Sequence, residues 1–121
     1  MHIAIATTWG PTDTTRATLP FLHAKAAREQ GDSVTLMLLH DAVLLAKGDT
    51  AQDIVAFGPP PLGPILDELA ADPQVEVIVC TPCVKVRRIA EGELHTNTRL
   101  GTLGDFHRAI RENNATVANY G

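Results

Sequence analysis

Residues 75–88 read V-E-V-I-V-C-T-P-C-V-K-V-R-R. The first five are mostly β-branched and apolar, which is typical of a buried strand in a parallel sheet. Thr81 is a preferred helix N-cap, and Pro82 suits the first helical position because its missing N–H has no partner there. The stretch therefore predicts a strand that leads directly into a helix, with Cys80 at the junction.

Both cysteines of the chain, Cys80 and Cys83, lie in this stretch three residues apart, so on a helical turn they share a face. The spacing permits a disulfide, a shared metal ion, or a nucleophile with a resolving thiol. A helix N-terminus favours the thiolate, and Lys85, Arg87 and Arg88 add positive charge. The alternative is that both cysteines are small buried apolar side chains, as free cysteines often are. A Cys-X-X-Cys at a strand–helix junction favours thiol chemistry.

The chain has 121 residues, the usual size of one domain, and a formal net charge of −4. Its charges are scattered without a basic stripe, which argues against nucleic acid as a partner. No apolar run could span a bilayer, and the chain does not open with a signal peptide, so we expect a cytoplasmic protein with no membrane partner. In that compartment paired cysteines are more often catalytic or metal-binding than structural. A zinc site would need two further ligands, and neither a second Cys pair nor a His-X3-His motif occurs, so we expect no metal and no cofactor.

Strand-like and helix-like segments alternate along the chain. The expected strands cover residues 2–7, 33–39, 75–79, 95–100 and 115–120, and the expected helices cover 14–30, 62–71, 82–90 and 103–113. Pro20 interrupts the first helical pattern, so we expect a kink or a non-helical first turn there. The alternation predicts one α/β domain over residues 1–121, a flavodoxin-like three-layer sandwich with a mostly parallel five-stranded sheet and helices on both faces. The expected strand order is 2-1-3-4-5.

In such a sheet, sites form beyond the carboxyl ends of the strands. Polar side chains follow three of these ends, namely Thr8–Trp9, His40–Asp41 and Cys80. In the expected strand order, Thr8 and Trp9 lie beside Cys80, and His40 lies one strand further away. His40 is the candidate acid–base partner of the thiols because its unperturbed pKa is near neutrality. The alternative is that Thr8 only holds a turn and that Trp9 only covers the edge of the core.

Four short motifs follow one another in the chain: R-A-T-L-P-F-L-H-A-K-A-A at 16–27, H-D-A-V-L-L-A-K-G at 40–48, I-V-C at 78–80 and C-x-x-C-V-K-V-R at 80–87. Together they resemble the DsrE/DsrF-like family over nearly the whole chain. The resemblance implies an α/β fold, assembly as homotrimers or hexamers, and a role in cytoplasmic sulfur relay. In relay members a cysteine at the position of Cys80 carries a persulfide between partner proteins. Three features depart from the family pattern: His40 replaces a small residue, Arg88 stands where glycine is common, and Cys83 is a second thiol.

The first hypothesis is therefore a sulfurtransferase-type persulfide carrier, with Cys80 as the acceptor nucleophile and Cys83 as the resolving thiol. Arg87 and the helix N-terminus would stabilise the sulfur anion, and Pro82 would hold the two sulfurs at a fixed separation. Sulfur-donor and sulfur-acceptor proteins would be its partners. One alternative is a Cys-X-X-Cys thiol–disulfide oxidoreductase or redox sensor. Another is an oligomeric binding module whose cysteines do no covalent chemistry.

Overall fold

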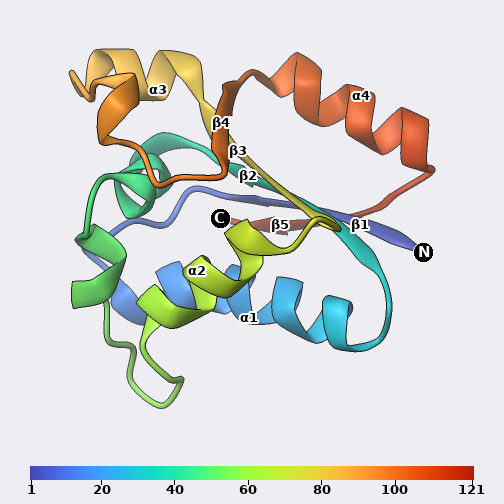
Figure 1. Cartoon of the computed structure of the whole chain (residues 1–121), viewed down its shortest axis with the longest axis horizontal. Coiled ribbons are helices and arrows are strands. Elements are labelled where there is room, and N and C mark those ends of the chain that lie inside the picture. Colours follow the sequence, from blue (N-terminus) through green and yellow to red (C-terminus); the bar gives the residue numbers. More distant parts are fainter.

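The computed structural model describes residues 1–121, and a five-stranded sheet runs through its centre (Figure 1). The strands are β1 (His2–Thr7), β2 (Ser33–Leu38), β3 (Val75–Cys80), β4 (Thr98–Gly101) and β5 (Thr116–Tyr120). Every pair of neighbouring strands is parallel, and the order across the sheet is β4-β3-β2-β1-β5.

Helices cover both faces of this sheet. The α-helices are α1 (Thr14–Glu29), α2 (Leu62–Ala71), α3 (Thr81–Val86) and α4 (Leu103–Asn113). Three short 3₁₀ helices lie in the connections: η1 (His40–Ala46), η2 (Thr50–Asp53) and η3 (Glu91–Glu93). In Figure 1, α1 and α2 lie on one side of the sheet, and α3 and α4 lie on the other. The predicted fold class, a three-layer α/β sandwich around a parallel five-stranded sheet, is confirmed.

The strand order 2-1-3-4-5 is wrong, because β2 rather than β1 occupies the centre of the sheet. All of β2 except Ser33 is buried, as expected of a central strand with helices on both faces. Strands β4 and β5 bury few of their residues and form the two edges. The chain steps from β1 through β2 and β3 to β4, and α4 then carries it back across the sheet so that β5 pairs with β1.

Helix α1 begins at an N-cap that the sequence predicts. The Asp13 carboxylate accepts the backbone N–H of Arg16 at 3.0 Å, which satisfies one of the free donors of the first turn. The expectation of a non-helical first turn before Pro20 is wrong, because α1 is helical from Thr14 onward. Pro20 has no N–H, so the helix lacks one hydrogen bond at this residue. Its ring is buried in the protein interior.

Helix α3 ends at Val86, earlier than the predicted Ala90, because the backbone at Arg88 turns left-handed with φ 55°. The N–H of Arg88 donates to the carbonyl of Lys85 at 3.0 Å, and the N–H of Ile89 donates to the carbonyl of Val84 at 3.1 Å. These two bonds form a Schellman motif, and Val84 and Ile89 are the buried apolar pair that accompanies it. Helix α1 ends in the same way, with Gly31 at the left-handed position.

Candidate functional site

The β3–α3 junction contains both thiols, one at the end of the strand and the other in the first turn of the helix. Cys80 ends β3 and is the N-cap of α3, and Cys83 lies in the first turn of α3. Both are free thiols. Cys80 is buried with 6% of its surface exposed, whereas Cys83 is half-buried. Thr81, which we expected to be the N-cap, instead donates its hydroxyl to the carbonyl of Gly101 at 3.1 Å and so ties the junction to β4.

Burial raises the pKa of the Cys80 thiol above its ordinary value of 9.0, and the neighbouring Cys83 side chain raises it further. The backbone N–H of Cys83 opposes this shift but does not overcome it. The helix N-terminus was expected to favour the thiolate of Cys80, and here the loss of water outweighs that effect. Cys80 is therefore held as a protonated thiol at neutral pH.

The sulfur of Cys83 accepts a hydrogen bond from the backbone of η1. The backbone N–H of His40 donates to Cys83 Sγ at 3.2 Å. His40 aims this N–H from a left-handed backbone conformation with φ 53°, which side chains other than glycine rarely adopt. Strained backbone of this kind persists only where surrounding contacts hold it, and it is frequent at functional sites. The more accessible sulfur of the pair thus accepts an N–H from a neighbouring element, η1.

Arg87 supplies the contacts that hold His40 in place. Its guanidinium donates to the Asp41 carboxylate from Nη2 at 2.8 Å and from Nε at 3.2 Å. It also donates to the Cys83 carbonyl at 3.1 Å and to His40 Nδ1 at 3.0 Å. The hydrogen bonds from Arg87 lower the pKa of Asp41 below its ordinary value, so the ion pair persists in mildly acidic solution. Since a guanidinium can only donate, His40 Nδ1 accepts, and in this tautomer the ring proton is on Nε2, which lies 3.9 Å from Asp41 Oδ2.

Thr8 and Trp9 do not lie beside Cys80, because β2 separates their strand from β3. Thr8 donates its hydroxyl to the carbonyl of Gly121 at 3.0 Å, and the Trp9 ring lies under the guanidinium of Arg16 at 4.7 Å. The same strand order brings His40 and Asp41 to the cysteines, one strand closer than expected.

The loop after β1 nevertheless supports the site through Gly10. A Cβ atom at this position would lie 2.5 Å from the carbonyl oxygen of Asp41, so only glycine permits this approach to the start of η1. The site therefore gathers His40, Asp41, Cys80, Cys83 and Arg87. Pro82 lies exposed in the first turn of α3.

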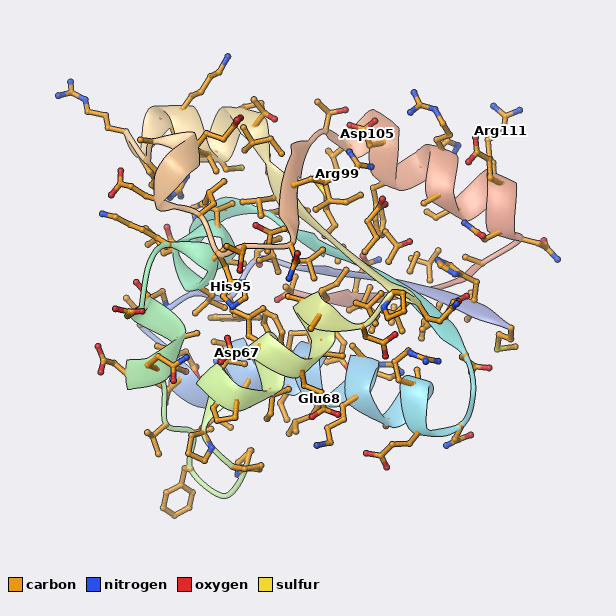
Figure 2. The ribbon with its side chains drawn as sticks, in the orientation of Figure 1. Asp67, Glu68, His95, Arg99, Asp105 and Arg111 are labelled. Atoms are coloured by element: carbon orange, nitrogen blue, oxygen red, sulfur yellow. The ribbon has the colours of Figure 1, made fainter.

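The contact between His40 and Arg87 was not predicted, because it depends on the strand order. A usable signal was present, since Arg87 lies four residues after Cys83 and therefore on the same helical face. The sequence also gave His95 no role. His95 Nε2 lies 2.7 Å from the carboxylate of Asp67, so it joins the segment before β4 to α2 (Figure 2).

Other features of the chain lie away from the thiols. A polar groove of about 600 Å³ lies between α4 and the starts of the central strands, and Arg99 and Asp105 line it (Figure 2). It contains no cysteine. No three His, Cys, Asp or Glu side chains are arranged to hold a metal ion. None of the helices has the length and apolar character needed to cross a membrane.

Comparisons with known proteins bear on the family and the fold of the chain. A model of the DsrE/DsrF-like family matches residues 1–118. Among solved structures, the chain is similar to the YchN protein from E. coli, with a TM-score of 0.76 and 24% identity over 99% of each chain. It is also similar to MTH1491 of Methanobacterium thermoautotrophicum, a protein of unknown function, with a TM-score of 0.66 and 8% identity over 98% of this chain and 97% of that chain. Both likenesses concern the fold. Curated protein sequences give no significant match.

Proposed function

Because the chain belongs to the DsrE/DsrF-like family, we propose that it is a sulfur-relay protein that holds sulfur as a persulfide on its cysteine pair. One observation carries the proposal. The half-buried Sγ of Cys83 accepts the backbone N–H of His40 at 3.2 Å, next to a second free thiol. This hydrogen bond favours the thiolate, which is the nucleophilic form of cysteine.

Sulfur enters on Cys83. Its thiolate attacks the terminal sulfur of a donor persulfide, R–S–SH. The S–S bond of the donor breaks, its electron pair leaves with the donor as the thiolate R–S⁻, and Cys83 becomes Cys83–S–SH. The exchange involves no net oxidation, so it needs no cofactor. The His40 N–H stabilises the negative charge on Cys83 before the attack and on its persulfide afterwards.

Cys80 is the resolving thiol. Its sulfur attacks the inner sulfur of the Cys83 persulfide, and the bond to the terminal sulfur breaks. The terminal sulfur leaves as hydrogen sulfide, taking the proton of Cys80, and a Cys80–Cys83 disulfide remains, which a thiol reductant must open before the next cycle. These roles are the reverse of those expected from the sequence, because burial makes Cys80 the less accessible thiol and raises its pKa.

The test is loading by a small donor. The protein is incubated with cysteine persulfide, and its intact mass is measured. We expect an added sulfur that accumulates in Cys80→Ser, a short-lived added sulfur that gives way to the Cys80–Cys83 disulfide in the wild type, and no added sulfur in Cys83→Ser. Loading of Cys83→Ser at the wild-type rate would return the acceptor role to Cys80. If no variant gains sulfur but the wild type forms a disulfide with a disulfide substrate, the protein is a thiol–disulfide oxidoreductase instead.

We further propose that the carrier works in the cytoplasm as a homotrimer or hexamer, and exchanges sulfur with donor and acceptor proteins. Two free thiols fit a reducing compartment. Two apolar side chains support self-association, because Phe57 is 95% exposed and Leu103 is 59% exposed.

A further inference from the structure

The outer surface of α3 next to Cys83 is exposed and lacks a partner. It consists of Pro82, Lys85, Val86 and Arg88, which we call the α3 rim. Pro82 directly precedes Cys83, and Val86 lies one helical turn beyond it. Val86, the last residue of α3, is an apolar side chain that is 75% exposed. The rim therefore borders Cys83 on α3.

The two basic side chains of the α3 rim carry uncompensated charge. Seven of the ten Lys and Arg residues form ion pairs within 4.0 Å, which leaves Lys85, Arg88 and Arg111. Two of these three are in the rim, although the whole chain has a net charge of −4.

Nearby carboxylates do not neutralise the rim. Asp41 is bound to Arg87, and Glu93 lies 4.0 Å from Lys47. Glu91, which follows the rim in η3, forms no ion pair. The rim is therefore a basic surface with an apolar centre on an acidic protein.

Arg88 carries its charge at a backbone position that strains any residue other than glycine. It occupies the left-handed position of a Schellman motif, with φ 55°. Glycine fits that conformation without strain, and the equivalent position after α1 is Gly31. The guanidinium of Arg88 makes no hydrogen bond or ion pair that would repay the strain within the chain. The left-handed turn ends α3, and glycine would end it without strain, so no contact within the chain explains an arginine at this position.

We propose that the α3 rim docks the protein that exchanges sulfur with Cys83, and that the docking surface of this partner is acidic around an apolar centre. The inference rests on the proposed function, since it is the exchange at Cys83 that brings the partner to this surface. Lys85 and Arg88 attract the carboxylates of the partner, and Val86 packs against its apolar centre. The attraction raises the rate of encounter more than it raises the affinity.

The test uses two synthetic persulfide peptides of equal length, in which the persulfidated cysteine is flanked by glutamates or by lysines. The rate of sulfur loading on the protein is measured with each. At low ionic strength we expect the glutamate peptide to load the wild type about tenfold faster than the lysine peptide. The difference should shrink in 1 M salt, where screening extends over only about 3 Å. In Lys85→Glu/Arg88→Glu the preference should reverse.

Arg111→Glu is the matched control, because Arg111 is also unpaired but lies on α4, away from α3 (Figure 2). This variant should keep the wild-type preference. Arg88→Gly, which suits the backbone, should fold and lose part of the preference. Equal loading by both peptides, faster loading by the lysine peptide, or the same reversal in Arg111→Glu would overturn the docking surface while leaving the persulfide carrier intact. A change of oligomer mass in Lys85→Glu/Arg88→Glu would assign the rim to self-association instead. No loading from either peptide or from cysteine persulfide would overturn both proposals.

Discussion

His40 and Arg88 are the two residues of the cysteine site with left-handed backbones, at φ 53° and 55°. His40 uses the conformation to point its N–H at Cys83, and Arg88 uses it to end α3. Each residue therefore combines a strained backbone with a side chain that glycine could not supply.

Replacing Arg88 with glycine should stabilise the protein by about 1 kcal/mol, because the left-handed conformation costs an L-residue roughly that much. The matched control is Gly31→Ala, which creates the same strain after α1 with nothing within 4 Å of the added Cβ, and which should destabilise by a similar amount. Urea unfolding measures both changes. A destabilised Arg88→Gly would mean that the arginine side chain stabilises the fold.

Cys80 should resist alkylation at neutral pH, because its pKa is raised above 9.0 and only the thiolate reacts. A raised pKa in the folded state means that the native protein holds this proton more tightly than the unfolded chain does. Stability should therefore fall as the pH rises past 9. Iodoacetamide labelling with peptide mapping at pH 7 and pH 10 separates the thiols. Labelling of Cys80 ahead of Cys83 at pH 7 would be the contrary result.

At the scale of elements, the site depends on how η1 packs against α3. Arg87 reaches across from the end of α3 to bind Asp41 and His40 at the start of η1. Gly10, in the loop after β1, closes the other side of η1. Three connections from neighbouring strands thus fix the position of one backbone N–H against one sulfur.

Gly10→Ala should destabilise the protein by about 1–3 kcal/mol and slow persulfide loading, since the new Cβ would displace Asp41 and with it the Arg87 contacts. Gly92→Ala is the control, because nothing lies within 4 Å of a Cβ there. Thermal unfolding and the loading rate are compared in both variants. If Gly10→Ala loads sulfur as fast as Gly92→Ala, the position of η1 has no effect on sulfur transfer to Cys83.

At the scale of the whole molecule, the proposed assembly predicts the mass of the particle in solution. Light scattering should return a mass three or six times that of one chain at micromolar concentration. The exposed Phe57 and Leu103 give a physical reason for association. A constant monomer mass over that range would contradict the proposed homotrimer or hexamer.

The layers of the fold could be predicted because each strand and helix has its own apolar pattern, and α2 and α4 have the predicted bounds. The strand order could not be predicted. The apolar sequence of a strand such as β2 indicates that both of its faces are covered, but it does not indicate which strands are its neighbours. The largely apolar sequence of β2 and the more polar sequences of β4 and β5 did indicate which strands lie at the centre and which at the edges. The cysteines were found from their spacing. Their relative burial and the His40 hydrogen bond depend on tertiary neighbours, so the order of their reactivity was out of reach.

The central claim is that Cys83 accepts sulfur and Cys80 discharges it. The most direct measurement is the lifetime of the persulfide, followed together with hydrogen sulfide release, in the wild type and in Cys80→Ser. An intramolecular attack is fast because the attacking thiol is already in place. We therefore expect the Cys83 persulfide to last at least tenfold longer in Cys80→Ser, with sulfide release suppressed. Equal lifetimes in the two proteins, or a Cys80→Ser variant that takes up no sulfur, would contradict this division of roles.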